Sequence, residues 1–169
     1  LKEMIPEKYR EQSIEIGKKM DMSVFKYVKG KILMAIYVGV VVGIFLGIFG
    51  VDFALVIGII TMFADIIPYI GPFLGFVPAV LFALLDSPTK ALFVIVMFPF
   101  VQWTENNIVG PKIMSDQLGY HPMIVLIITI AGGFLFGFIG MIFALPLVIA
   151  IEVVYRYYME NIKAKKKLD

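Results

Sequence analysis

The stretch from Phe53 to Leu85, FALVIGIITMFADIIPYIGPFLGFVPAVLFALL, decides how this chain folds. It holds 33 residues with a single charge, Asp65, and it is interrupted by Pro68-Tyr69-Ile70-Gly71-Pro72. As one straight helix it would be about 50 Å long, well beyond the roughly 30 Å of a bilayer's hydrocarbon core, whereas either arm alone is about 20 Å long and too short to cross. We therefore predict a re-entrant helical hairpin. Its tip should line a cavity, because irregular backbone at membrane depth needs protein or water around it.

The composition of the whole chain agrees with a membrane protein. It is 60% hydrophobic and 17% charged, against about 45–50% and 25% in soluble domains. Eight of its 15 Lys and Arg residues precede Ile32, and five more lie at or after Arg156. Basic residues at both ends predict that both termini face the cytoplasm, with the chain in the cell (inner) membrane. The net charge of +2 is small and split between the ends, which favours contact with the lipid bilayer and implies no nucleic-acid partner.

Three further stretches complete the organisation. Residues 32–51 are uncharged and long enough for one membrane span. Residues 91–103 form another apolar stretch, which ends in polar side chains. Residues 123–151 are again uncharged and are interrupted by Gly132, Gly133, Gly137 and Gly140. These glycines predict a second hairpin tip, although for Gly132 and Gly133 close helix packing is the favoured interpretation.

An internal repeat relates the two interrupted stretches. A shift of 68 residues places Ile59-Ile60-Thr61 on Ile127-Ile128-Thr129 and Pro78 on Pro146. The unit would be one span followed by one hairpin, in residues 32–85 and 91–153. Two hairpins would make the repeat inverted, with the loop 86–90 outside the cell and the loop 111–120 inside. Two full crossings would make it parallel, and charge counting leaves both alternatives open.

The fold class predicted is therefore all-α: an integral membrane protein of transmembrane helices and two broken, re-entrant hairpins. The transport domain should span residues 32–158. Residues 1–31 should form an amphipathic interfacial helix and linker, with residues 7–28 either on the membrane surface or continuing an upstream helix. Residues 159–169 form a basic cytoplasmic tail.

Paired interrupted segments are the best sequence indication of a transporter's binding site. Asp65 is costly within an apolar arm, so it should face the protein interior or water. Capping of backbone N–H groups and contact with a substrate or ion remain alternatives for it. The internal cations, Lys90 and Lys112, are not placed by sequence to pair with it. The residues predicted to bind a substrate or ion are Thr61, Asp65, Gln102, Glu105, Asn106, Asn107 and Thr129.

Enzymatic chemistry has little support in the sequence. There is no cysteine and one histidine, with no catalytic or metal-ligand spacing around it. His121 is expected to cap a helix that begins near Pro122. Glu152 is expected to pair with Arg156 one helical turn later. We predict no catalytic residue, no metal site and no cofactor; any coupling would be to protons or sodium ions.

Several motifs in this order resemble the autoinducer-2 exporter family of multi-pass prokaryotic permeases. They are Ile67-Pro68-Tyr69-Ile70-Gly71-Pro72, Glu105-Asn106-Asn107-Ile108-Val109-Gly110-Pro111-Lys112, Leu118-Gly119-Tyr120-His121-Pro122, and the glycines from Gly132 to Gly140 with Pro146. The resemblance implies a homo-oligomeric transporter that moves a small polar signalling molecule or another small solute, with helical hairpins that hold the substrate. We expect its motion to be an elevator-like or rocking displacement of the hairpin pair. The hairpin-tip residues are then Pro68, Tyr69, Gly71, Pro72, Gly132, Gly133, Gly137 and Gly140.

Two other functions remain open. Some members of the family exchange cations for protons, so a sodium/proton antiporter is the first alternative. A non-transporting oligomeric membrane scaffold is the second. The chain opens at Leu1 without an initiator Met, and the family's members are about twice as long, so we expect this to be the C-terminal half of a longer protein whose N-terminal half is a partner.

Overall fold

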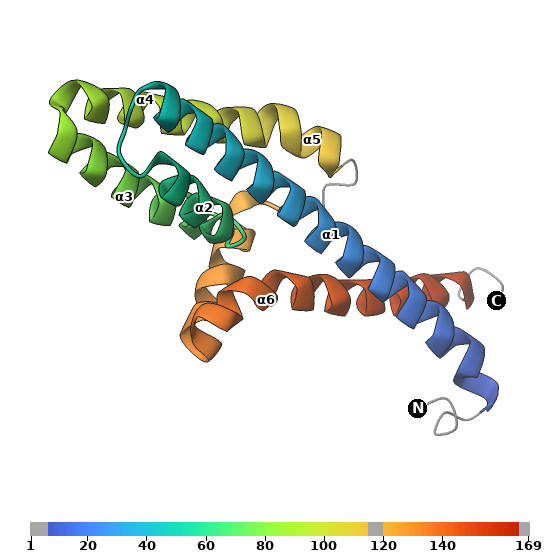
Figure 1. Cartoon of the computed structure of the whole chain (residues 1–169). Coiled ribbons are helices and arrows are strands. Elements are labelled where there is room, and N and C mark those ends of the chain that lie inside the picture. The colour runs from blue at the N-terminus through green and yellow to red at the C-terminus, as the bar shows by residue number, and fades with distance from the viewer. Residues whose placement is uncertain (1–6, 115–119, 166–169) are drawn as a thin grey trace.

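A computed structural model describes residues 7–114 and 120–165, and the side chains of residues 14–114 and 120–159. The described residues form helices and no strand, as the predicted all-α class requires (Figure 1). The helices are α1 (Glu7–Ile48), α2 (Ala54–Ala64), α3 (Ile70–Asp86), α4 (Pro88–Thr104), the π-helix η1 (Glu105–Val109), α5 (Gly110–Ile113) and α6 (Pro122–Lys165).

Helices α2 and α3 form the predicted hairpin. The two segments that flank it lie at the same end of the helix bundle, because the ammonium of Lys90 donates a hydrogen bond of 2.5 Å to the carbonyl of Gly50. The rings of Phe53 and Phe82, near the open end of the two arms, are 5.2 Å apart. The chain therefore returns to the end from which it came, and the full crossing that charge counting left open does not occur in residues 53–85.

The break at the hairpin tip differs in detail from the sequence interpretation. A glycine in the interrupting segment is the natural candidate for positive φ. Gly71 nevertheless lies inside α3, and the residue with positive φ is Tyr69, at φ 63° and ψ −39°. The amide of Ile70 donates to the carbonyl of Pro68 at 2.7 Å across Tyr69, which makes the tip a strained γ-turn. Gly71 serves close packing instead, since a Cβ there would lie 2.1 Å from the carbonyl oxygen of Ala64.

Helix α6 is itself a hairpin, because the backbone turns at Gly137 with φ 64° and ψ −147°, a conformation essentially confined to glycine. Its arms pack closely: a Cβ at Gly132 would lie 2.5 Å from the carbonyl oxygen of Gly140, and one at Gly133 would lie 2.6 Å from Met141. Of the four predicted tip glycines, Gly137 makes the turn. Gly132, Gly133 and Gly140 bring the arms together, which for the first two is the packing role favoured from sequence.

Helix α1 runs without interruption from Glu7 to Ile48. The segment 7–28, expected to lie on the membrane surface or to continue an upstream helix, is thus continuous with the first span. Nothing breaks the helix at the junction. Gly30 there is buried, and a Cβ on it would lie 3.0 Å from the side chain of Met114. The domain boundary near residue 31 remains a prediction.

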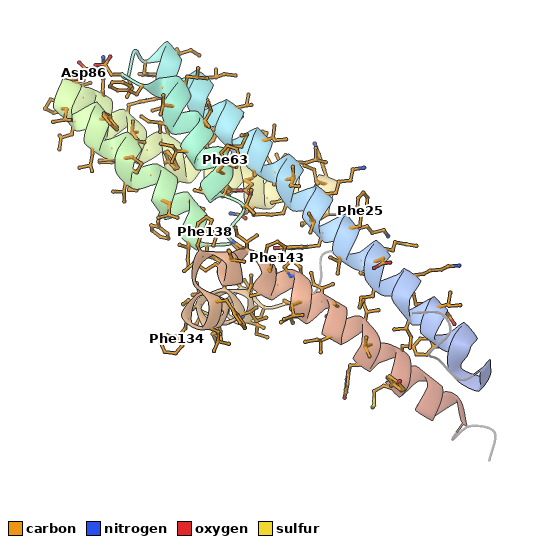
Figure 2. All side chains as sticks on the ribbon, turned by 60° about the horizontal axis from the view of Figure 1, so that its bottom comes forward. Phe25, Phe63, Asp86, Phe134, Phe138 and Phe143 are labelled. Carbon is orange, nitrogen blue, oxygen red and sulfur yellow. The ribbon has the colours of Figure 1, made fainter. Side chains whose placement is uncertain are left out.

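The core lies among the first four helices, where α1 and α3 each pack against α2 and α4. It is built from aliphatic side chains and one ring, among them Val38, Leu46, Ile57, Ala79 and Phe98. Many large apolar side chains instead point outward from the helices, including Phe63 and Phe134 (Figure 2). Water would not stabilise such a surface, whereas lipid would.

Three described helices, 14–48, 88–113 and 122–159, are long and apolar enough to cross a membrane. The last of them folds back at Gly137. The chain is an all-α membrane protein in which a long helix followed by a hairpin occurs twice.

Candidate functional site

A buried ionic cluster joins three separate elements of the fold. The ammonium of Lys31 on α1 lies 2.8 Å from Oδ2 of Asp65 and 3.4 Å from Oε1 of Glu105. The side chains of Asp65 and Glu105 are 1% and 3% exposed, and that of Lys31 is 13% exposed. Two carboxylates thus share one ammonium in the interior of an otherwise apolar helix bundle.

Asp65 occupies an unfavourable place for a carboxylate. It is the C-cap of α2, where the helix dipole and the last carbonyl groups favour a positive charge. Lys31 provides that charge. Capping of backbone N–H groups, one of the two roles left open from sequence, is wrong, because Oδ2 accepts from Lys31 and Oδ1 has no partner among the described residues.

The sequence interpretation missed Lys31. It sought a partner for Asp65 among the internal cations Lys90 and Lys112, and it assigned Lys31 to the basic interfacial segment. Lys90 instead contacts Gly50 and Asp86. The available signal was position: Lys31 is the last charge before the apolar run from Ile32, so its side chain can reach inward while its backbone continues α1.

Glu105 reaches the cluster through a local irregularity. It begins the π-helix η1, in which the amide of Gly110 bonds to its carbonyl. The side-chain amides of Asn106 and Asn107 donate to the carbonyls of Gln102 and Trp103, each at 2.9 Å. The wider turn leaves Glu105 buried while both asparagines are exposed. Single π-turns inside helices occur frequently at functional sites.

A cavity of about 180 Å³ opens beside the cluster. Helix α1, the first hairpin tip, the end of α4 with η1, and α6 all contribute to its wall. The lining residues are Tyr27, Lys31, Met34, Asp65, Pro68, Tyr69, Pro72, Gln102, Glu105, Asn106, Met114, Val125 and Leu145. Two buried polar atoms of this wall have no partner among the described residues, the acceptor Oδ1 of Asp65 and the donor Nε2 of Gln102.

The structure brings together some of the predicted site residues and leaves others apart. Asp65, Gln102, Glu105 and Asn106 line the cavity with the tip residues Pro68, Tyr69 and Pro72. Thr61, Asn107, Thr129 and Gly71 do not line it. The hydroxyls of Thr61 and Thr129 are used within their own helices, where they donate to the carbonyls of Ile57 and Val125 at 2.8 and 2.9 Å.

A second polar cluster lies where α6 begins. The hydroxyl of Tyr120 donates to Glu152, which also pairs with Arg156 as predicted. Burial raises the pKa of Tyr120 to about 12, and the bond to Glu152 adds to the effect. His121 caps the helix as expected, accepting from the amide of Met123 at 3.3 Å. These contacts connect the start of α6 with its second arm, and none of their residues lines the cavity beside Lys31.

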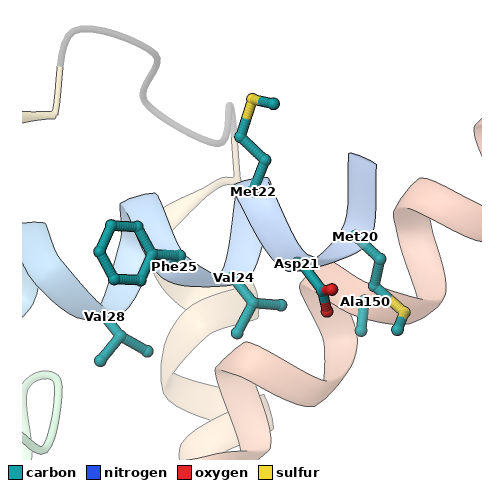
Figure 3. A pocket seen from close by; sticks show the side chains of 7 residues that line it. All are labelled: Met20, Asp21, Met22, Val24, Phe25, Val28 and Ala150. Carbon is teal, nitrogen blue, oxygen red and sulfur yellow. The ribbon is translucent and has the colours of Figure 1, made fainter. Parts of the chain in front are cut away.

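A larger groove, of about 660 Å³, lies between α1 and α6. Figure 3 shows its lining, which is apolar apart from Asp21 and includes Met20, Phe25 and Ala150. It lacks converging polar groups of the kind that orient a solute in a binding site. The smaller cavity with the ionic cluster is the better candidate.

Comparison with known proteins shows similarity to membrane transporters. Residues 1–160 match the sequence profile described as AI-2E family transporter. YueF of Bacillus subtilis (strain 168) is 33% identical over 164 residues, covering 97% of this chain and 44% of YueF. YrrI of the same strain is 33% identical over 156 residues, covering 92% and 44%. Both names describe candidate transport proteins.

A third relative carries a more specific name. The AI-2 transport protein TqsA of Escherichia coli (strain K12) is 30% identical over 132 residues, covering 78% of this chain and 38% of TqsA. The chain spans less than half the length of each of these relatives. By the profile match over almost its whole length, this chain belongs to the AI-2E transporter family.

Proposed function

We propose that this chain is the solute-binding part of a membrane transporter and that the cavity beside Lys31, Asp65 and Glu105 holds a small polar solute during transport. The observation that carries the proposal is the fully buried Asp65 at the break of a helical hairpin, with one carboxylate oxygen unpartnered. A charge at the centre of a membrane helix costs about 2.5–3.5 kcal/mol on insertion scales, and such residues typically mark substrate or ion pathways.

The unpartnered atoms favour a solute with hydroxyl groups. Oδ1 of Asp65 accepts hydrogen bonds, and Nε2 of Gln102 donates them. A hydroxyl group does both, so hydroxyl groups of a solute match the hydrogen-bonding needs of these atoms. One relative is named as an AI-2 transport protein, and we propose a small polar signalling molecule of this kind as the first solute to test.

The proposed motion is an elevator-like displacement of the hairpins. The α2–α3 hairpin carries Asp65 at its tip, whereas Lys31 and Glu105 lie on α1 and η1. Displacement of the tip would open the cavity on one side. We further propose that the protein lies in the cell (inner) membrane with both ends of this chain cytoplasmic, that it acts as a homo-oligomer, and that a preceding N-terminal half completes it.

Sodium/proton antiport is the second candidate, favoured by one specific observation. Two carboxylates share a single lysine, so the fully ionised cluster carries one excess negative charge that a cation or a proton could neutralise. Asp65 or Glu105 would then release a proton as the cation binds.

The experiment uses the full-length protein in liposomes, with uptake of an AI-2-type solute and sodium-evoked proton flux measured in parallel. Asp65→Asn is compared with Asp86→Asn, a control at an exposed carboxylate paired with Lys90. Solute uptake that Asp65→Asn abolishes and Asp86→Asn preserves supports the proposal. Proton flux without solute uptake would establish the antiporter instead. If neither solute uptake nor proton flux is detected for the wild type or any variant, the result would favour the non-transporting scaffold.

A further inference from the structure

We propose that Lys31 is a built-in cation of the solute cavity: its ammonium occupies the place that an external sodium ion or proton would otherwise have to take. The inference rests on the proposed solute site and assigns to Lys31 a specificity-determining role. A cavity with its own cation would bind its solute without a coupled ion.

The position of the ammonium supports this role. It lies between carboxylates from two other elements, at 2.8 Å from Asp65 and 3.4 Å from Glu105. A sodium ion bound here would need the same carboxylate oxygens, because hard cations prefer oxygen ligands. Asp65 lines the cavity, and its Oδ1 remains without a partner among the described residues. The lysine thus neutralises the site without using every acceptor in it.

The charges around the cavity leave the protein no substitute for Lys31. Among the described lining residues it is the only cation. The other titratable groups of the wall are Asp65, Glu105, Tyr27 of α1 and Tyr69 of the hairpin tip, and α6 contributes the apolar Val125 and Leu145. The net charge of the ionised cluster is −1 with Lys31 and would be −2 without it. Two carboxylates confined in a buried site do not both stay ionised without a nearby cation.

The test is the thermal unfolding of the purified full-length protein. Sodium chloride replaces choline chloride at constant ionic strength, and a separate series lowers the pH. The variants are Lys31→Gln, Lys31→Arg and Lys31→Gln/Asp65→Asn. Lys29→Gln serves as the matched control, since Lys29 is an exposed residue on the same helix.

We expect the melting temperature of the wild type, Lys31→Arg and Lys29→Gln not to respond to sodium. That of Lys31→Gln should rise by several degrees with sodium or with acidification, because either ligand binds the folded site. The double variant restores the net charge of −1 and should lose the response to sodium. If Lys31 only made a structural contact with Asp65, the additional change Asp65→Asn would not cancel the effect of Lys31→Gln.

Three results would overturn the inference. One is saturable stabilisation of the wild type by sodium, which would show that the cation site is open beside Lys31. Another is a Lys31→Gln variant whose melting temperature responds neither to sodium nor to acidification. The third is a failure of both Lys31→Gln and the double variant to fold. Because no solute enters this experiment, a positive result would stand even if solute uptake failed, and that failure would count against the proposed function alone.

Discussion

The ammonium of Lys31 and the carboxylate of Asp65 meet at 2.8 Å across 34 positions of the sequence. The contact ties the first long helix to the tip of the hairpin that follows it. Removing one partner of a buried ion pair typically costs about 3–5 kcal/mol, because the other charge is left uncompensated. The ion pair therefore holds the hairpin tip against α1. A displacement of the tip must either break the pair or move Lys31 together with Asp65.

Because the α2–α3 hairpin begins and ends at the same end of the helix bundle, it predicts which loops lie on which side of the membrane. The loop that contains Ser87 should face outside the cell, and the segment 111–120, partly outside the described residues, should face the cytoplasm. Because the chain has no cysteine, Ser87→Cys and Ser115→Cys can each be probed alone with an impermeant thiol reagent. Labelling of intact cells should occur for the first variant only. The reverse pattern would contradict the predicted orientation.

Close packing of the hairpin arms predicts a sharp cost at Gly71. In Gly71→Ala the new Cβ would lie 2.1 Å from a backbone oxygen of the opposite arm, and backbone gives way less easily than a side chain. Overpacking of this kind typically costs about 1–3 kcal/mol. Thermal unfolding should show a melting temperature lower by several degrees.

Gly47→Ala is the matched control for Gly71, because a Cβ at this exposed helical glycine would meet nothing within 4 Å. Alanine favours a helix over glycine by up to about 1 kcal/mol, so this variant should be neutral or slightly more stable. Equal effects of the two changes would show that the arms are not in close contact.

The γ-turn at Tyr69 predicts that glycine is more stabilising than alanine at this position, the reverse of the order inside a helix. Its φ of 63° is strained for any residue with a Cβ, by about 1–3 kcal/mol. Tyr69→Gly should therefore be more stable than Tyr69→Ala by about 1 kcal/mol. The same pair at Ile44, an exposed position inside α1, should show the opposite order. Measured melting temperatures that favour alanine at both positions would exclude the strained turn.

The sequence was sufficient for the architecture because two length limits acted together. A bilayer bounds the length of an apolar helix, and proline and glycine mark where the interrupted stretches must turn. That argument predicted both hairpins, and the cost of a charge within an apolar arm predicted that Asp65 faces the protein interior or water. It could not distinguish Tyr69 from Gly71 as the strained residue, since γ-turn strain at a tyrosine leaves no compositional signal.

The site itself was only partly predictable, for a reason of geometry. Thr61 and Asp65 share a helix face, but Thr61 turns into the packing between the arms and not into the cavity. Lys31 lies 34 residues before its partner and adjoins a basic segment, so no local pattern connects the two. The π-turn that places Glu105 likewise depends on packing.

The last prediction separates solute binding from ion coupling through the two buried carboxylates. Asp65→Asn should weaken solute binding more than Glu105→Gln, because Asp65 holds Lys31 at the shorter distance and has a carboxylate oxygen without a partner among the described residues. A hydrogen bond to a charged group contributes about 1.5–3 kcal/mol, which corresponds to roughly a tenfold to hundredfold rise in the half-saturating concentration.

The pH profile of transport then decides between the two mechanisms. If the carboxylates only bind a neutral solute, both amide variants should keep the wild-type profile. If they exchange protons, the variants should abolish the pH dependence while folding and oligomerisation persist. Glu152→Gln is the control, since Glu152 pairs with Arg156 away from the cavity. Wild-type affinity and pH response in both amide variants would remove the site assignment, because the charge pair buried at the hairpin break would then serve packing alone.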